Sequence, residues 1–243
     1  MKKLLVSLLL LCFLISFAQT TYHFNKMLTY EYTEYQRPQK NHIRIYLINS
    51  LDNSFFAYLD NKGQEYQITF VHQDILYAQT SLHKTALING DIRLNCDSIS
   101  NYQNPYKYQT RNYDFTPVKD TLVNNKNYKY YYIRHNKPKM AIKKKAGRLL
   151  YIINTENSSL PLLTYPTAFE EWKLNRNIPN GIIEEIHFYN YKGEHITTER
   201  LIKSENVHKT IFTPDCSTKT ITTTSTRIIN TCLLYTSDAA DEG

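Results

Sequence analysis

The fold class is decided by residues 24–35, which read Phe-Asn-Lys-Met-Leu-Thr-Tyr-Glu-Tyr-Thr-Glu-Tyr. From Leu28 to Tyr32, apolar or aromatic residues alternate with polar ones, which is the period of a half-buried strand and not of a helix. Tyrosine and threonine are also residue types that favour strands. The stretch therefore predicts a β-strand at the start of a β-rich domain.

The same pattern recurs on the C-terminal side of this stretch. Short apolar runs follow one another, separated by segments rich in asparagine, aspartate, proline or glycine, which are typical of turns. Strands joined in succession by short turns form an antiparallel meander. The strands predicted in this meander cover residues 24–35, 43–48, 55–59, 66–72 and 75–82.

The second half of the chain predicts further strands and one helix. The helix is expected at 167–174 after Pro166, because Thr167 and Glu170 have the spacing of a capping box. We therefore expect a mainly β, antiparallel fold with one short helix near 167–174. The strands predicted in this half cover residues 113–118, 128–134, 149–154, 182–191 and 194–203, with a turn at 124–126.

Residues 1–18 have the features of a secretory signal peptide. Basic residues precede an apolar run that is too short to span a membrane, and Ser16 and Ala18 are the small residues that signal peptidase accepts. We expect cleavage before Gln19. The mature chain is then exported to the periplasm, the outer surface or the medium.

A lipid anchor at Cys12 is the alternative interpretation of this segment. Leucines precede Cys12 where a small residue is needed, and the apolar run continues past it. We therefore favour a cleaved signal over a lipid anchor. No second apolar stretch approaches membrane length, so no transmembrane segment is expected in the mature chain.

The last residues differ from the rest of the chain in composition. Residues 232–242 read Cys-Leu-Leu-Tyr-Thr-Ser-Asp-Ala-Ala-Asp-Glu, and their codons reproduce a transposon-end adapter of sequencing libraries. We expect 232–243 to be an artefact of this adapter, although an ordinary acidic tail is the alternative. Residues 19–212 are then a single β-rich domain, and 213–231 are a Thr/Ser-rich tail whose natural continuation is unknown.

The remaining chain is basic. The 29 basic residues lose Lys2 and Lys3, and the 22 acidic residues lose Asp238, Asp241 and Glu242, which leaves 27 against 19. This balance suits an anionic partner, such as lipid headgroups or polysaccharide of the envelope. Nucleic acid is not expected as a partner of an exported protein.

A basic cluster near the middle of the chain is one candidate for such contacts. Lys143, Lys144, Lys145 and Arg148 lie close together in the sequence and could form an anion-binding patch. The alternative is a solvated loop.

Tyrosine is the prominent residue type, with 21 tyrosines against a single tryptophan. Most are expected to be half-buried strand residues, and stacking on sugars is the alternative. The polar segment 101–111 could be a surface loop that contacts a ligand. The candidate ligand-binding residues are Tyr102, Tyr106 and Tyr108 in this segment, with Phe169 and Trp172 in the predicted helix.

Motifs for nucleotide binding and for common hydrolases are absent from the sequence. It contains neither GxGxxG nor a Walker loop, and neither GxSxG nor HExxH. The histidines and cysteines have no metal-binding spacing, so we expect no metal and no cofactor. Cys96 and Cys216 could form a disulfide in an oxidising compartment, or could be one buried and one exposed thiol.

Paired glutamates are the best candidates for catalysis. Glu170 and Glu171 lie beside Trp172, and Glu184 and Glu185 follow two isoleucines. A glycoside hydrolase needs two facing carboxyl groups beside an aromatic platform. Adjacent glutamates more often alternate between solvent and a sheet edge, and we assign no catalytic residue.

The segments 160–173 and 178–186 carry a resemblance to a known family. A proline-bearing strand end, a short aromatic stretch and a Pro-x-Gly turn are similar in order to the segment that names the GLPGLI family of exported Bacteroidota proteins. Phe17-Ala18-Gln19 also resembles the signal ending of uncharacterised flavobacterial exported proteins. Ile178-Pro-Asn-Gly-Ile-Ile183 departs from the full motif. The resemblance implies a curved, half-open β-barrel related to the lipoprotein carriers, without known catalytic residues.

Three functions remain open. The first is a module that binds an apolar or amphipathic envelope ligand on a curved sheet, with Trp172 and its helix as a plug. The second is a structural or interaction protein of the envelope with a filled core. The third is a glycan hydrolase that uses Glu170, Glu171 or Glu184. An enzyme is the less expected reading, and the oligomeric state is left open.

Overall fold

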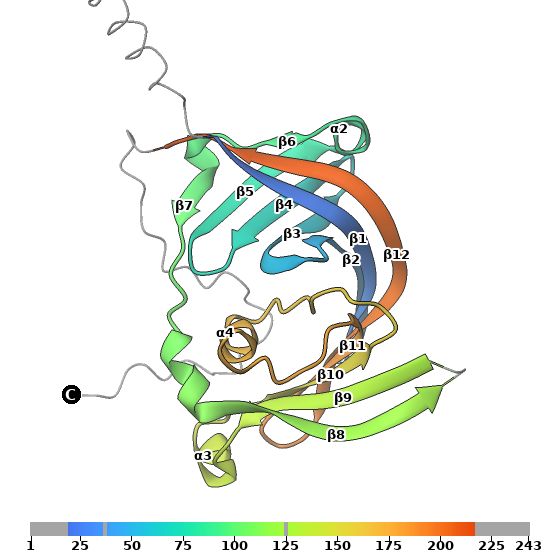
Figure 1. The fold of residues 1–243 in the computed structure, drawn as a ribbon, viewed down its shortest axis with the longest axis vertical. Helices are drawn as coiled ribbons and strands as arrows, with labels where there is room; N and C mark the ends of the chain where they lie inside the picture. The colour runs from blue at the N-terminus through green and yellow to red at the C-terminus, as the bar shows by residue number, and fades with distance from the viewer. Residues whose placement is uncertain (1–18, 36–37, 124–125, 217–243) are drawn as a thin grey trace, which may run out of the picture.

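The computed structural model describes residues 19–35, 38–123 and 126–216, with only the backbone of Ile88, Asn89, Lys119 and Val123. These residues form a mainly β fold, as the sequence predicts (Figure 1). The predicted signal peptide, most of the turn at 124–126, the tail from residue 217 and the expected artefact at 232–243 lie outside the described residues.

The described chain contains twelve strands in one sheet. The strands are β1 (Thr20–Glu34), β2 (Lys40–Asn49), β3 (Asp52–Lys62), β4 (Glu65–His72), β5 (Leu76–His83), β6 (Ile92–Arg93), β7 (Ile99–Asn101), β8 (Tyr113–Val123), β9 (Lys126–His135), β10 (Arg148–Asn154), β11 (Ile182–Tyr189) and β12 (His195–Thr213). The helices are α2 (Lys84–Asn89), α3 (Pro138–Lys143) and α4 (Pro166–Asn175), with 3-10 turns η1 (Cys96–Ser98) and η2 (Lys107–Asn112).

The strands β1 and β12 lie at the centre of the sheet. The strand order is β7-β5-β4-β3-β2-β1-β12-β11-β10-β9-β8, and β6 pairs with β12 outside this path. Bulges between Phe24 and Lys26 and between Thr29 and Tyr30 interrupt the β1–β12 ladder. Because bulges bend a strand and increase its twist, these two long strands curve, as Figure 1 shows. The sheet is therefore open and curved, and it is antiparallel apart from the short parallel pair of β6 with β12.

The strands of the N-terminal meander bury both faces. On one face, which we call the outer face, Leu47, Phe55 and Phe70 form a core cluster with Leu87 of α2 and Ile92 of β6. The intervening residues point the other way because side chains alternate along a strand. Buried apolar residues of these strands therefore lie on both faces, which explains short apolar runs such as residues 43–48 in the sequence.

The other face, which we call the inner face, is covered by α4 and the segment before it. In the N-terminal half, Tyr46, Phe56 and Val71 pack with Leu162. In the C-terminal half, Leu149, Tyr151 and Ile186 pack with Phe169 and Trp172 of α4. Figure 1 shows α4 inside the curve of the sheet. On the inner face, α4 and the segment before it therefore pack against both halves of the sheet.

The predicted helix is present, but its predicted cap is wrong. Tyr165 is the N-cap residue and makes no side-chain capping bond, while Pro166 begins the helix. Proline is favoured in the first turn because its φ is already helical and its missing N–H has no partner there. Glu170 is buried and does not reach back to the cap. The helix ends at Arg176, which adopts a left-handed φ of 48°.

The prediction of a single helix is incomplete, because α2 and α3 are also present. Each has six residues, which is too short for a helical apolar period to appear in the sequence. In α2 the side chain of His83 accepts a hydrogen bond from the backbone N–H of Thr85. A histidine cap is not among the usual start signals of a helix.

A disulfide joins Cys96 to Cys216, so the paired alternative is the correct one. The Cα atoms are 5.6 Å apart, and the two residues are separated by 120 positions in the sequence. The bond ties η1 to the chain just beyond β12. Strand β12 itself continues to Thr213, with Ile211 fully buried, so the sheet extends one residue past the predicted end of the domain at 212.

Removing this disulfide is expected to destabilise the fold. The variant Cys96→Ser/Cys216→Ser should lose about 2–5 kcal/mol of unfolding free energy, because the bond restricts a long loop in the unfolded chain. Urea denaturation followed by circular dichroism measures the loss. Reductant should lower the stability of the wild type by a similar amount and leave the double variant unchanged; equal stability of both proteins in oxidising buffer would contradict the pairing.

Candidate functional site

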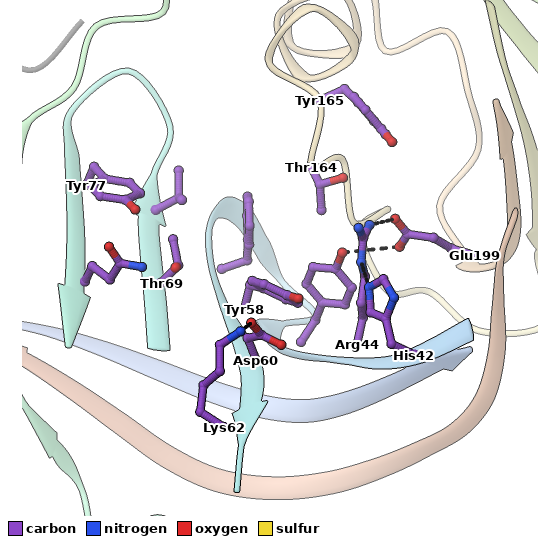
Figure 2. A pocket seen from close by; sticks show the side chains of 14 residues that line it. His42, Arg44, Tyr58, Asp60, Lys62, Thr69, Tyr77, Thr164, Tyr165 and Glu199 are labelled. Carbon is purple, nitrogen blue, oxygen red and sulfur yellow. Dashed lines mark hydrogen bonds and ion pairs between the residues drawn. The ribbon is translucent and has the colours of Figure 1, made fainter. Parts of the chain in front are cut away.

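A cavity of about 480 Å³ lies on the inner face, between strands β2–β5 and the segment that leads into α4. Figure 2 shows side chains from both sides pointing into it. It is lined by His42, Arg44 and Tyr46 of β2, Phe56, Tyr58, Asp60 and Lys62 of β3, Thr69 and Val71 of β4, Tyr77 and Gln79 of β5, Thr164 and Tyr165 before α4, and Glu199 of β12.

Strand alternation places these side chains together. Arg44 and Tyr46 share a face of β2, and Phe56, Tyr58 and Asp60 share a face of β3. Antiparallel pairing sets Tyr46 directly opposite Tyr58. The cavity is therefore built from every second residue of neighbouring strands, while the residues between them form the apolar outer face.

The most buried charged groups in the cavity lining are the ion pair of Arg44 and Glu199. Their side chains are only 9% and 4% exposed, and Arg44 Nη1 donates to Glu199 Oε1. The hydroxyl of Tyr46 donates to Glu199 Oε2 at 3.2 Å. The guanidinium of Arg44 lies 3.6 Å from the ring centroid of Tyr32 on β1. The pair thus bridges β2 and β12 across β1.

The ionisation of this cluster follows from burial and from the pair itself. Burial alone would lower the pKa of Arg44, but the carboxylate of Glu199 raises it above its ordinary value. Burial, and then Glu199, raise the pKa of Tyr46 well above its usual range. Burial and the charge of Arg44 lower the pKa of His42. At neutral pH Arg44 is therefore charged, Tyr46 is protonated and His42 is neutral.

The remainder of the lining combines apolar surface with neutral polar groups. Phe56 and Val71 are buried and apolar. Burial raises the pKa of both Tyr58 and Tyr77, so their hydroxyl groups stay protonated at neutral pH. Asp60 forms an ion pair with Lys62 at the rim. Each charged group that lines the cavity is thus matched by a partner of opposite sign, and the site is close to neutral.

The predicted tyrosine segment does not line this cavity. Tyr102 is buried, and burial raises its pKa to about 12. Tyr106 and Tyr108 lie at the surface beside η2, where they are 37% and 56% exposed. Arg111 lies 5.8 Å from the ring centroid of Tyr108. The proposed role of these residues in ligand binding stays a prediction.

The predicted aromatic residues of the helix serve the core. Phe169 and Trp172 are buried in the cluster that joins α4 to the C-terminal strands. Arg176 covers the ring of Trp172 at 3.6 Å. The part of the helix region that reaches the cavity is its N-terminal approach, at Thr164 and Tyr165.

The predicted basic patch is divided by the structure. Lys143, Lys144 and Lys145 are exposed at the end of α3. Arg148 is half-buried, and its guanidinium lies 5.3 Å from the ring centroids of both Tyr132 and Tyr189. The anion-binding role of the three lysines stays a prediction.

The candidate catalytic glutamates lie away from the cavity lining. Glu171 is buried, which raises its pKa, and its Oε1 accepts hydrogen bonds from Asn175 and Asn177 at 2.8 and 3.0 Å. Glu184 accepts a hydrogen bond from Asn154 at 3.0 Å. Among the described residues, the carboxylates that line the cavity are Asp60 and Glu199.

Across 19–35, 38–123 and 126–216, no group of three or more His, Cys, Asp or Glu side chains is placed to hold a metal ion. In the same ranges no helix has the length and apolar character needed to cross a membrane.

Sequence reasoning missed the ion pair, although one signal for it was present. Arg44 lies within the apolar run Ile43-Arg-Ile-Tyr-Leu-Ile48 and shares a face with Tyr46 and Ile48. A charge on the buried face of a strand needs a partner of opposite sign. Its partner Glu199 is 155 positions away, so only the pairing of β1 with β12 reveals it.

Breaking the ion pair is expected to cost more than breaking a surface pair. Glu199→Leu leaves Arg44 uncompensated and should lower the unfolding free energy by about 3–5 kcal/mol, whereas Arg44→Leu/Glu199→Leu should recover most of the loss. Asp120→Asn removes an exposed pair with Lys129 and should change stability by less than about 1 kcal/mol. Chemical denaturation measures all three; a Glu199→Leu effect as small as that of Asp120→Asn would contradict a desolvated pair.

Comparisons with known proteins concern the fold. No protein-family model and no curated protein matches the sequence. The chain is similar to the solved structure of the Pseudomonas aeruginosa MucA/MucB complex, with 6% identity and a TM-score of 0.40 over 75% of this chain and 51% of that chain. It is similar to a putative outer membrane lipoprotein-sorting protein domain from Vibrio parahaemolyticus, with 7% identity and a TM-score of 0.32 over 75% of this chain and 85% of that chain. It is also similar to a LolA superfamily protein from Nitrosomonas europaea, with 10% identity and a TM-score of 0.27 over 79% of this chain and 88% of that chain.

The chain spans about half the length of the MucB structures that it matches. The resemblance to the GLPGLI family is not matched by a family model.

Proposed function

We propose that this chain binds an uncharged, single-chain amphiphile of the cell envelope in the cavity on the inner face. The observation that supports this most directly is the mixed lining of the cavity, which combines buried apolar side chains with protonated hydroxyl groups. Its volume of about 480 Å³ lies within the range of small-molecule sites, about 300–1,000 Å³.

The apolar part of the ligand would contact the inner-face core. Phe56 and Val71 belong to the cluster that contains Tyr46, and the ring of Tyr58 packs against it. Removing apolar ligand surface from water beside these side chains supplies the driving force, at roughly 25 cal/mol per Å² of buried area.

The polar part of the ligand would contact hydroxyl and amide groups. Tyr58, Thr69, Tyr77, Gln79 and Thr164 offer neutral donors and acceptors around the cavity. A charged headgroup would compete with an existing ion pair, because Arg44 is engaged by Glu199 and Lys62 by Asp60. Separating the buried pair is costly, so an uncharged headgroup such as a glycerol or a sugar is favoured.

The two other functions receive less support. The hydrolase alternative relies on Glu170, Glu171 or Glu184, and none of these lines the cavity. The carboxylates that do line it, Glu199 and Asp60, are both paired with cations and are not free to act as acid or base. A purely structural envelope protein would have no use for a cavity of this size. It is the outcome that remains if no amphiphile binds.

Export is part of the proposal. The predicted signal peptide places the mature chain outside the cytoplasm, and the Cys96–Cys216 disulfide supports an oxidising compartment. Lipid and polysaccharide of the envelope are then the accessible ligands, and the resemblance to the exported GLPGLI proteins agrees with this location.

Competition against a fluorescent apolar probe tests the ligand class. Monolauroylglycerol should displace the probe at a concentration at least about tenfold lower than laurate or dodecyltrimethylammonium, a difference of 1.4 kcal/mol. The cavity-filling variant Val71→Trp should weaken binding of monolauroylglycerol by about tenfold or more, because the larger ring occupies the space of the acyl chain.

Val118→Trp is the matched control, because Val118 is 48% exposed on β8 and lies outside the cavity lining. It should bind as the wild type does. Absence of binding to the wild type, or equal affinity of Val71→Trp and wild type, would overturn the proposal and favour the structural alternative.

A further inference from the structure

A second group of polar side chains lies on the outer face, where β11 and β12 form a hairpin. His187 on β11 is directly opposite Thr198 on β12. The next residue along β12, Glu199, belongs to the cavity, and neighbouring residues of a strand point to opposite faces. This group is therefore separated from the cavity by the sheet itself.

Three atoms of this group form a nearly equilateral triangle. His187 Nδ1 is 3.2 Å from His195 Nε2 and 3.1 Å from Thr198 Oγ1, and His195 Nε2 is 2.9 Å from Thr198 Oγ1. The carbonyl oxygen of Thr197 lies 3.1 Å from His195 Nε2. Two imidazole nitrogens and two oxygens thus converge on one small volume.

The spacing of these atoms matches the coordination shell of a metal ion. Neighbouring ligand atoms bonded at about 2.1 Å in the tetragonal geometry of Cu²⁺ are separated by about 3.0 Å. A cation located about 1.1 Å above the plane of the triangle would lie at this bonding distance from all three atoms. Coordination would need His195 to carry its proton on Nδ1, because Nε2 donates to the carbonyl oxygen of Thr197 in this structure.

A contact with Glu185 orients the ring of His187 so that its Nδ1 faces His195 and Thr198. Its Nε2 lies 2.8 Å from Glu185 Oε2, and the other oxygen of Glu185 accepts a hydrogen bond from Arg200 Nε at 2.9 Å. A histidine that donates one N–H to a carboxylate presents the lone pair of its other nitrogen. Metal-binding histidines usually have such a carboxylate partner.

The ring of His195 is held between neighbouring aromatic groups. Its centroid lies 4.5 Å from that of Tyr35 and 4.9 Å from that of Tyr189, with a nearly parallel arrangement to Tyr189. Fixing the ring in this way reduces the entropy that would be lost on binding. The side chain of His187 is 14% exposed and Thr198 is buried, so an entering ion would have to displace part of this cover.

We propose that His187 and His195, together with Thr198, form a binding site for a divalent late first-row transition-metal ion. Two imidazole nitrogens select such ions over Mg²⁺ and Ca²⁺, which prefer oxygen ligands. Cu²⁺ binds most tightly, and Zn²⁺ follows, in keeping with the general order of affinity. Thr198 and water complete the coordination, and Glu185 is a positioning residue.

Copper titration of the full, tag-free chain after treatment with chelator tests the site. We expect one equivalent of Cu²⁺ per chain, with nitrogen hyperfine structure in the electron paramagnetic resonance spectrum, and no retention of Mg²⁺ by native mass spectrometry. His187→Gln and His195→Gln should each weaken Cu²⁺ binding at least tenfold. Glu185→Gln should weaken it by about tenfold while the nitrogen signature remains.

His208→Gln is the matched control, because His208 is an exposed histidine on the same strand. It should keep the wild-type affinity and spectrum. Circular dichroism and the denaturation midpoint in the absence of metal show that each variant is folded. Equal Cu²⁺ affinity of the wild type and a folded His187→Gln/His195→Gln variant would overturn the proposal and leave a hydrogen-bonded histidine pair.

Discussion

The pairing of β1 with β12 is the interaction on which the rest of the structure depends. It joins the first strand of the described chain to the last, from Thr20 opposite Thr213 to Glu34 opposite Thr197. The N-terminal meander extends from one side of this pair and the C-terminal strands from the other. Contacts between residues so distant in sequence are costly in chain entropy. The Cys96–Cys216 disulfide just beyond β12 reduces this cost, because it restricts the unfolded chain near the end of the strand.

The candidate site on the inner face depends on the same pairing. Arg44 belongs to the meander and Glu199 to the C-terminal half, and they meet because one strand, β1, lies between their strands. Their charges cancel inside the curve of the sheet, so the cavity is polar without being charged. The outer face of the hairpin carries a different chemistry at His187 and His195, and the sheet keeps the two sites apart.

The strands could be predicted from the sequence because alternation is a local property. The meander up to His83 was found in this way. The helix at α4 was located by Pro166 and by a capping box that the structure does not form, and the six-residue helices α2 and α3 were too short for periodicity to appear. The site was not predicted, because a pair 155 residues apart depends on register. Trp172 is a rare residue type in this sequence and was therefore selected as a candidate ligand contact. It is large and apolar, and it packs in the core. Histidines 187 and 195 seemed scattered because a hairpin, unlike a helix, brings together residues that are eight positions apart.

Amide hydrogen exchange with and without saturating monolauroylglycerol tests directly whether the ligand binds in the cavity, because it locates the ligand without any substitution. We expect added protection in β2, β3 and β4 and in the segment that includes Thr164 and Tyr165, with unchanged exchange in β8 and β9. Protection confined to β8 and β9, or to the loop around Tyr106 and Tyr108, would contradict a ligand site on the inner face.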